Sequence, residues 1–236
     1  MERLDKIIAS QGQYSRSEVK KLVKGGRVTL DGSVVRSSDV KADPDKSVIA
    51  IDGKVLGYKK HIYIMLNKPQ GVVSATDDKD HKTVIDLVPK ELRRDGLFPA
   101  GRLDGDTVGF VLITDDGDFA HEILSPKNHI MKTYHATLER PVTADDIRAF
   151  REGIELRDGT LCLEAEVRSL DGDIPMAEIK ICEGKYHQVK RMFAALGNKV
   201  VFLKRVKMGE LFLDESLEEG QCREITPDEL TLIKQK

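Results

Sequence analysis

The sequence predicts an α+β protein, and three features of its 236 residues support that class. Short apolar or alternating runs, typical of strands, recur along the chain between turn residues. A few segments between them have the spacing and the capping residues of amphipathic helices. Strand runs joined by hairpin-like turns favour antiparallel pairing. We therefore expect a mixed, mostly antiparallel β-sheet flanked by helices.

The N-terminal part of the chain begins with two predicted helices. Residues 4–8 have apolar side chains at helical spacing, which predicts a short first helix. Ser15 and Glu18 form a capping box at the start of a second helix, and Gly25-Gly26 ends it. Two strand-like segments follow, a hairpin over residues 28–35 and a strand over residues 48–51.

The remainder of the chain alternates between predicted strands and helices. Apolar or alternating runs predict strands over residues 62–66, 109–114, 134–138, 161–167, 177–181 and 200–203. Helical spacing and caps predict helices over residues 84–88, 144–152, 189–196 and after Thr226. Asp116-Gly117 predicts a turn, and the alternation in residues 161–167 places Leu161 and Leu163 on a buried face. Tyr58-Lys59-Lys60 is typical of a linker, so the predicted domains are residues 1–58 and 59–236.

Charge is unevenly distributed along the chain. The whole sequence has a net charge of −2. Residues 1–60 contain 13 Lys/Arg against 8 Asp/Glu, a balance of +5, which leaves −7 for the rest. Within that rest, residues 180–207 hold eight basic residues and one acidic residue. Because phosphate binding depends on the local potential, two basic regions on an acidic chain suit an RNA-binding protein.

Long apolar segments and paired cysteines are both missing from the sequence. No run reaches the roughly 18 apolar residues that a membrane helix needs. The charged N-terminus lacks the apolar centre of a signal peptide. We therefore expect a cytoplasmic protein with no membrane partner and, by default, a monomer. Cys162, Cys182 and Cys222 lie far apart and predict buried thiols instead of disulfides or a zinc site.

The segment Pro99–Gly109 carries most of the chemical information. It is a glycine-rich loop that leads into an apolar strand, so the sheet would hold a carboxylate at Asp104 in front of a cleft. The nearby aspartates do not form a calcium loop, because Val108 occupies a position that must supply an oxygen. The histidines show no ligand spacing, and no P-loop or dinucleotide fingerprint is present. The sequence therefore predicts neither a metal nor a cofactor.

The first 55 residues resemble the S4 RNA-binding domain. The resemblance rests on Arg3-Leu4-Asp5-Lys6, on Ser15-Arg16 with Glu18, and on Gly26–Gly32. In that family, a helix pair and the loop after it clamp structured RNA through basic side chains. The positions that match this role are Arg3, Arg16, Lys20, Lys21 and Arg27. The resemblance thus implies an RNA partner but no chemistry.

The rest of the chain resembles the RsuA-type pseudouridine synthases. The matching motifs occur in order, and they are Pro99–Gly109, Thr114–Gly117, Ser125-Pro126, Lys132–Tyr134 and Glu183–Phe193. Phe110 stands where relatives more often have leucine, an apolar exchange that leaves the expected chemistry unchanged. The resemblance implies that a uridine of ribosomal RNA is isomerised to pseudouridine. That reaction involves no redox change or group transfer, so it requires no cofactor.

The resemblance also implies roles for five residues of the second domain. Asp104 would act on the ribose, either as a nucleophile or as a base, and Lys190 would keep its carboxylate ionised. Tyr134 would stack on the target base, with Leu203 packed beneath that base. Arg102 would hold the flipped-out state open. Judged without the family, Tyr134 suits a sheet core better than a stacking role, Leu203 suits a sheet core nearly as well, and Lys190 also suits a surface contact with RNA.

Two other functions compete with this interpretation. A non-catalytic S4 protein, for instance an assembly factor that binds ribosomal RNA, is disfavoured by the intact Asp104, Tyr134 and Lys190. A metal-dependent phosphoryl-transfer enzyme using Asp104 and Asp106 would need magnesium. Among synthases, the motifs closest to those of the 16S small-subunit enzyme are Asn67–Gly71, Thr76–Asp78 and Gln188–Arg191. A large-subunit target on the same scaffold is the alternative.

Overall fold

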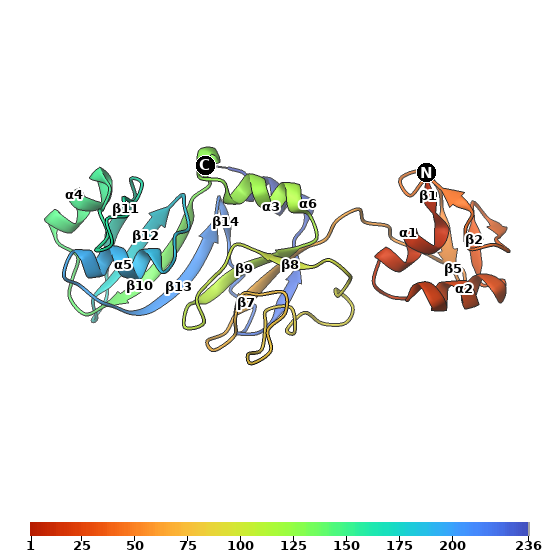
Figure 1. Cartoon of the computed structure of the whole chain (residues 1–236), viewed down its shortest axis with the longest axis horizontal. Helices are drawn as coiled ribbons and strands as arrows, with labels where there is room; N and C mark the ends of the chain where they lie inside the picture. Colours follow the sequence, from red (N-terminus) through yellow and green to blue (C-terminus); the bar gives the residue numbers. More distant parts are fainter. Residues whose placement is uncertain (236) are drawn as a thin grey trace. The chain divides into compact units, whose positions relative to one another are not determined.

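The computed structural model describes residues 1–235, which form two compact units (Figure 1). The first unit comprises Met1–Ile62 and Pro89–Leu97. The second comprises Tyr63–Val88 and the chain from Phe98 onward. Pro89–Leu97 thus belongs to the first unit although it lies well beyond residue 58. Lys236, the last residue of the predicted second domain, lies outside the described residues.

The first unit packs two helices onto short strands. The capping box of Ser15 and Glu18 is present at the start of the second helix, as its sequence predicts. Apolar residues of both helices and of the strands form one core that includes Leu4, Ile8 and Val19. The elements are β1 (Glu2–Arg3), α1 (Leu4–Ser10), α2 (Arg16–Lys24), β2 (Val28–Leu30), β3 (Ser33–Val34), β4 (Lys41–Ala42), β5 (Ile49–Ile51) and β6 (Lys54–Val55).

A mixed sheet organises the second unit. Its main path runs β11-β12-β10-β13-β9-β7-β15, with β14 paired to β13 and β8 paired to β9. Every pair is antiparallel except β9–β13, so the predicted mostly antiparallel sheet is confirmed. The strands are β7 (Tyr63–Lys68), β8 (Phe98–Ala100), β9 (Val108–Thr114), β10 (Lys132–Leu138), β11 (Glu166–Leu170), β12 (Met176–Ile181), β13 (Val200–Met208), β14 (Leu211–Phe212) and β15 (Cys222–Glu224).

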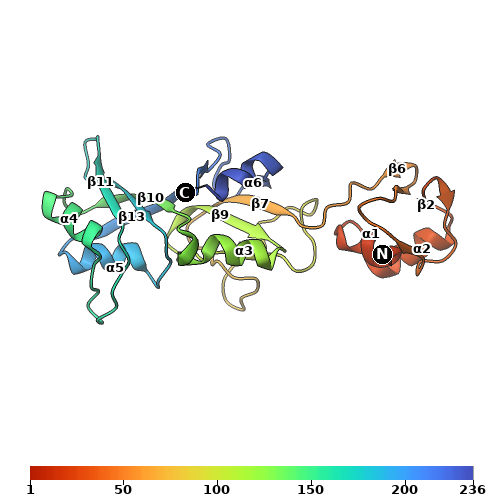
Figure 2. The same ribbon diagram turned by 90° about the horizontal axis from the view of Figure 1, so that it is seen from above.

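Helices cover the sheet at both ends. Helices α4 and α5 lie beside β11 and β13, away from α3 and α6 (Figures 1 and 2). The second unit contains α3 (Gly117–Leu124), the 3₁₀ turn η1 (Pro126–Asn128), α4 (Ala144–Glu152), α5 (Gln188–Ala195) and α6 (Pro227–Ile233). The α4 and α6 helices both begin at the N-caps that their sequences predict, Thr143 and Thr226, and in the structure each cap is part of a capping box.

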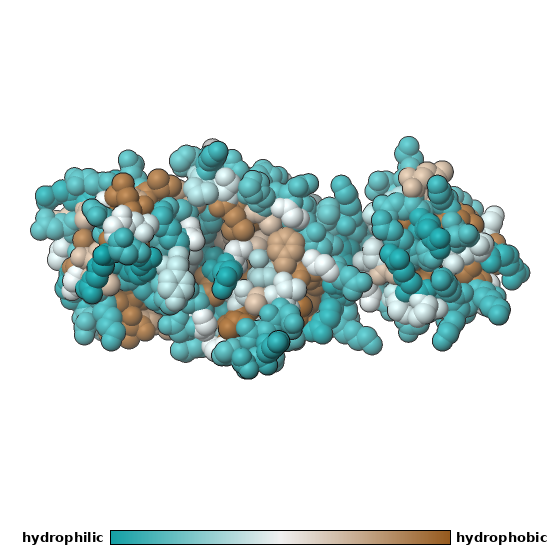
Figure 3. Space-filling model, viewed as in Figure 1, coloured by the Kyte–Doolittle hydropathy of each residue, from teal (hydrophilic) through white to brown (hydrophobic). Residues whose placement is uncertain are grey.

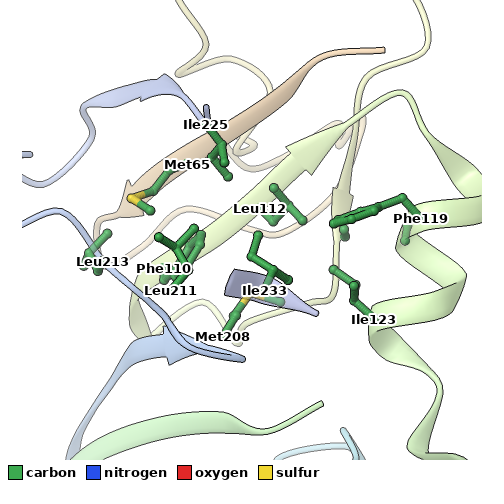
Figure 4. Close-up of a cluster of buried hydrophobic side chains, with 12 residues drawn as sticks. Met65, Phe110, Leu112, Phe119, Ile123, Met208, Leu211, Leu213, Ile225 and Ile233 are labelled. Carbon is green, nitrogen blue, oxygen red and sulfur yellow. The ribbon is translucent and has the colours of Figure 1, made fainter. Parts of the chain in front are cut away.

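The core of the second unit forms where α3 and α6 meet the central strands. Phe110 and Leu112 from β9 pack with Ile123 from α3 and Ile233 from α6 (Figure 4). All four side chains are fully buried. Burial of such side chains contributes roughly 1.5–3 kcal/mol each, so this cluster is a main source of stability for the strand that follows the Asp104 loop.

Two of the predicted elements are wrong. Residues 84–88 form turns and no helix, although Thr83 and Asp86 exchange the hydrogen bonds expected of a cap. Pro89 disfavours helical backbone at the residue before it, so the single turn does not extend. Asp116-Gly117, predicted as a turn, instead begins α3, with Asp116 accepting from the Phe119 N–H group. Because glycine has a low helix propensity, the sequence did not indicate that a helix begins at Gly117.

The predicted strand over residues 161–167 is also only partly correct. Strand β11 begins at Glu166, and Leu161 and Leu163 are exposed. The buried residue between them is Cys162, whose N–H group donates to the Ile154 carbonyl. Ala165 and Val167 do face the core. The strict alternation of apolar residues therefore misassigned the face in the first half of the run.

The face of the molecule drawn in Figure 3 is mostly hydrophilic. Figure 3 shows polar side chains over most of the visible face, with small separate hydrophobic areas. Among residues 1–235, no helix combines the length and the apolar character needed to traverse a bilayer.

Candidate active site

A cavity opens in the second unit beside the loop that precedes β9. It encloses about 390 Å³, including the space at its open mouth. Its walls include four of the sequence-predicted site residues, Arg102, Asp104, Tyr134 and Leu203. The fifth, Lys190, contacts Asp104 directly. The structure therefore brings these five residues together from one loop, two strands and a helix.

Glycines shape the loop that carries Asp104. Gly101 has φ +90°, and a Cβ there would lie 2.9 Å from Leu124 Cδ2. Gly109 has φ +97°, and a Cβ there would lie only 2.3 Å from the Arg205 carbonyl oxygen on β13. A side chain at either position would collide in a backbone conformation that favours glycine. Gly109 thus allows β9 to approach β13 closely, and Gly101 leaves room for Leu124 of α3, with Asp104 between the two glycines in sequence.

A buried lysine also contacts the backbone of the loop that carries Asp104. Lys68, at the end of β7, is 0% exposed, and its Nζ donates to the carbonyls of Thr107 at 2.9 Å and Gly105 at 3.3 Å. Burial lowers the pKa of Lys68 to about 8, although Asp106 and Asp104 act in the opposite direction. Charged donors make strong hydrogen bonds in such surroundings. Lys68 therefore holds the backbone on both sides of Asp106.

Asp104 is part of a small charged cluster. Its Oδ2 lies 3.0 Å from Lys190 Nζ, and its Oδ1 lies 3.5 Å from His187 Nε2. The side chains of Asp104 and Lys190 are 25% and 22% exposed, so water screens this pair only in part. Lys190 also donates to Asp106 Oδ1 at 2.5 Å. One ammonium thus pairs with two carboxylates, and the three groups together keep a net charge of −1.

Lys190 and Asp106 stabilise each other's charged forms. Burial alone would lower the pKa of Lys190, but its hydrogen bonds to Asp106 and Asp104 outweigh burial and raise that pKa. The hydrogen bond from Lys190 in turn holds the pKa of Asp106 below its ordinary value. Lys190 is therefore a cation, and Asp106 an anion, throughout the neutral range. A partly buried carboxylate beside that cation can stay ionised.

Tyr134 and Leu203 form the apolar side of the cavity. They project from neighbouring strands, β10 and β13, and both are buried. Arg205, also buried, donates from Nη1 to the Tyr134 hydroxyl at 3.5 Å and from Nε to the Phe110 carbonyl at 2.7 Å. A flat ring and a branched aliphatic chain on adjacent strands suit the two faces of a nucleobase. Arg102 is exposed at the cavity wall.

The predicted RNA contacts of the first unit fall into two kinds. Arg3 pairs with Asp5 at 2.8 Å, and Arg27 pairs with Asp52 at 2.5 Å. Arg16, Lys20 and Lys21 are exposed on α2, and no carboxylate of residues 1–235 lies within ion-pair distance of them. The α2 cations are therefore available to phosphate, whereas two guanidinium groups already have carboxylate partners.

The geometry is also relevant to the alternative function, in which Asp104 and Asp106 would bind a metal ion. Within the described part of the chain, no group of three or more His, Cys, Asp or Glu side chains is placed to hold a metal ion. Lys190 Nζ occupies the position between Asp104 and Asp106 that a bridging cation would need. Asp104, Asp106 and Lys190 thus form a salt bridge at the place where the two carboxylates would have to hold a metal ion.

Sequence reasoning missed three residues at this site. Lys68 stands at the end of an apolar strand, where a charged residue signals either an edge or a buried partner. Arg205 follows Leu203 by two positions, so it shares the buried face of β13. His187 adopts φ +48°, a left-handed conformation that is uncommon outside glycine and that sequence does not reveal.

Comparisons with known proteins agree with this geometry. Residues 62–195 match the family model described as RNA pseudouridylate synthase, and residues 2–46 match the S4 domain. The chain is 45% identical over 235 residues to the uncharacterized RNA pseudouridine synthase YtzG of Bacillus subtilis, covering 99% of this chain and 98% of that protein. It is 44% identical over 233 residues to ribosomal small subunit pseudouridine synthase A of Escherichia coli K12, covering 98% and 99%.

A solved structure supports the same assignment. The crystal structure of a pseudouridylate synthase superposes with a TM-score of 0.68 at 42% identity, and the match covers 99% of this chain and 100% of that one. Likeness at this level of identity over both full lengths extends beyond the fold to the sequence motifs. With its S4 domain and its aspartate-bearing cavity, the chain belongs to the RNA pseudouridylate synthase family.

Proposed function

We propose that this RNA pseudouridine synthase modifies a uridine of 16S ribosomal RNA and that the Asp104 carboxylate acts on the ribose of that uridine. The observation that carries the proposal is the Asp104–Lys190 pair, 3.0 Å apart, in a cavity walled by Tyr134 and Leu203. A carboxylate beside an apolar, base-sized surface is what the reaction needs.

The reaction defines the tasks of these side chains. The bond from ribose C1′ to uracil N1 breaks, the base rotates, and a bond from C1′ to C5 forms. A proton leaves C5 and N1 gains one, so atoms and charge balance within the nucleotide. Asp104 would start this sequence either by attacking C1′ or by removing a ribose proton. In both routes the carboxylate must be ionised, and Lys190 supplies the compensating charge.

Tyr134 and Leu203 would hold the base while it is detached. Stacking of a base on an aromatic ring contributes roughly 1–3 kcal/mol, and the stack still allows the base to rotate in its own plane. The hydrogen bond from Arg205 to the Tyr134 hydroxyl fixes the ring at the back of the cavity. Leu203 provides an apolar surface that excludes water from the reacting bond.

The target nucleotide must leave its stack to reach this cavity. Flipping costs a few kcal/mol in a structured RNA. Arg102 is exposed at the cavity wall, so its guanidinium could occupy the vacated place in the stack or bind the flanking phosphate. The α2 cations of the S4 domain would add affinity for RNA through its phosphates.

The choice of 16S ribosomal RNA rests on the relatives and on motifs. The Escherichia coli relative is named for the small ribosomal subunit. The Asn67–Gly71 turn packs against the catalytic loop, with the Gly71 N–H group donating to the Gly105 carbonyl at 2.8 Å. A large-subunit target remains the second candidate because the scaffold is shared. A non-catalytic assembly factor would not require the Asp104–Lys190 pair.

One experiment tests function and target together. Pseudouridine is mapped across all ribosomal RNA from cells with the gene, without it, and without it but carrying the wild-type or the Asp104→Asn protein. We expect one 16S position to lose pseudouridine on deletion and to regain it only with the wild-type protein. Loss confined to large-subunit RNA would refute the target. Restoration by the Asp104→Asn protein would refute the role of the carboxylate.

A further inference from the structure

Tyr186 and His187 form a stacked pair next to the cavity. Their ring centroids are 3.8 Å apart and their planes differ by 17°. His187 lines the cavity, and its Nε2 lies 3.5 Å from Asp104 Oδ1. Tyr186 lies beyond His187 and is 75% exposed, so its outer ring face is open to solvent. The order from the catalytic carboxylate outward is thus Asp104, His187, Tyr186.

The backbone presents this pair in a fixed position. His187 has φ +48° and ψ +36°, a strained conformation for a residue with a side chain, directly before α5. The buried Gln188 braces the segment, because its Oε1 accepts from the Lys185 N–H group at 2.9 Å and its Nε2 donates to Glu183 Oε1 at 2.6 Å. Arg191 Nη1 also donates to the Tyr186 carbonyl at 3.3 Å. The tyrosine therefore sits on a braced turn.

We propose that the outer face of Tyr186 binds the base of a nucleotide adjacent to the target uridine. This site is separate from the surface of Tyr134 and Leu203, and its ligand is a nucleobase. The proposal rests on the proposed function, because it assumes that the target nucleotide occupies the cavity beside Asp104. An exposed aromatic ring at the margin of an RNA-binding cavity is the usual platform for an unstacked base.

The physical reason for a second platform is the cost of flipping. When the target leaves its stack, its neighbours lose a stacking partner as well. A ring at the cavity margin replaces that partner and stabilises the flipped state. Stacking on the outer face of Tyr186 uses the π-face that every base has, so it requires no particular base edge. The site should therefore tolerate any base.

The test combines protein variants with RNA that lacks a base. The substrate is a fragment of the ribosomal RNA that contains the uridine identified by mapping. Three forms are compared: the intact fragment and fragments with an abasic nucleotide on the 5′ or the 3′ side of the target. The enzyme is the full chain, as wild type, Tyr186→Leu and Tyr186→Phe. Phe212→Ala serves as the matched control, because Phe212 is 62% exposed on β14 and does not line the cavity.

We expect Tyr186→Leu to lower kcat/KM on the intact fragment by about 5- to 150-fold, the range that corresponds to one base–aromatic stack. Tyr186→Phe and Phe212→Ala should stay within about twofold of wild type. On one of the two abasic fragments, the wild type should fall to the level of Tyr186→Leu, and the variant should lose nothing further. Such coupling between a side chain and a missing base identifies a direct contact.

Other outcomes would overturn the proposal. If Tyr186→Leu acts only by displacing His187 and Asp104, its loss will persist on both abasic fragments. Equal losses for Tyr186→Phe and Tyr186→Leu would point to the hydroxyl and contradict stacking. An unchanged kcat/KM for Tyr186→Leu would show that Tyr186 does not stack on a base. Failure of the 16S assignment appears separately, in the mapping experiment, because the fragment is chosen from whichever site that map gives.

Discussion

The two units of the molecule hold their cations in opposite ways. On α2 of the S4 unit, Arg16, Lys20 and Lys21 extend into solvent and no ion pair within the described chain restrains them. In the catalytic unit, Lys68 is buried and fixes backbone carbonyls, and Lys190 is half-buried between two carboxylates. Exposed cations contribute to a summed field, whereas enclosed cations determine local geometry. Single substitutions should therefore matter far more in the second unit.

The largest expected effect is at the carboxylate that the enclosed cations serve. Asp104→Asn should lower kcat by at least about 10³-fold, because an amide neither attacks the ribose nor accepts its proton. RNA affinity should stay within about twofold. The measurements are single-turnover pseudouridine formation and equilibrium binding of the same RNA. Asp106→Asn is the control, since that side chain is 62% exposed, and it should cost less than about tenfold. Similar losses for both variants would favour the paired-carboxylate metal site.

The next effect separates two buried lysines. Lys68→Met leaves the Gly105 and Thr107 carbonyls without their donor and should lower both stability, by about 2–4 kcal/mol, and kcat, by roughly 100-fold. Lys132→Met removes donors to the Ile123 and Cys182 carbonyls, neither of which belongs to the Asp104 loop. It should lower stability similarly but leave kcat of the folded enzyme near normal. Denaturant unfolding and single-turnover rates provide the two readouts. Equal kcat values for both variants would show that Lys68 does not position the loop.

Much of this architecture follows from the sequence, and each exception has a physical cause. The capping boxes at Ser15, Thr143 and Thr226 rest on local hydrogen bonds, so residue type and spacing suffice to find them. The start of α3 at Gly117 depends on packing of Phe119 and Ile123 against the sheet, which local propensity does not contain. Tertiary packing thus decided the start of α3, whereas a local effect, Pro89, prevented the helix predicted over residues 84–88.

The residues of the candidate site also differ in whether the sequence alone indicates them. The family motifs indicate Asp104, Tyr134 and Lys190 because each is defined by its neighbours in the sequence. Lys68 and Arg205 act through carbonyls of loops and strands distant in sequence, so only the fold reveals their partners. The surface position of Leu161 shows the converse, since a correct residue pattern gave the wrong face. The sequence motifs thus predict the reacting side chains, and the structure shows which residues contact and support them.

Arg102 belongs to neither class of cation, because it is exposed but lies at the cavity. If it stabilises the flipped state, Arg102→Ala should lower kcat/KM about tenfold more on structured RNA than on a short flexible strand, where no stack must be opened. As the control, Arg148→Ala replaces an exposed arginine on α4 and should leave kcat/KM unchanged on both RNAs. Equal losses of Arg102→Ala on both RNAs would mean that the arginine contributes only charge.

The exposed α2 cations should give small and additive effects. Replacing Arg16, Lys20 and Lys21 singly with glutamine should weaken RNA binding by a few-fold each and leave kcat unchanged. Each side chain that no longer binds a phosphate lowers the slope of log affinity against log salt by about 0.7–0.9. Titrations between low and moderate salt measure that slope, and the triple variant should change it about three times as much as one replacement. A salt slope that all three replacements leave unchanged would place the RNA elsewhere on the S4 unit.

The last prediction concerns the pH dependence of stability. Burial, with a contribution from Arg205, lowers the pKa of Lys132 to about 8, whereas an unfolded lysine titrates near 10.5. Between these pH values the unfolded chain binds a proton that the folded chain lacks. The free energy of unfolding should therefore rise with pH across this window, by up to ~1.4 kcal/mol per pH unit for this lysine. Below pH 8 both states are protonated and the contribution is constant. Denaturant unfolding of wild type and Lys132→Met at several pH values isolates it, because the other titrating groups cancel in the difference. Parallel curves would mean that Lys132 keeps its ordinary pKa in the fold, and the contrast between enclosed and exposed cations would then lose its electrostatic basis.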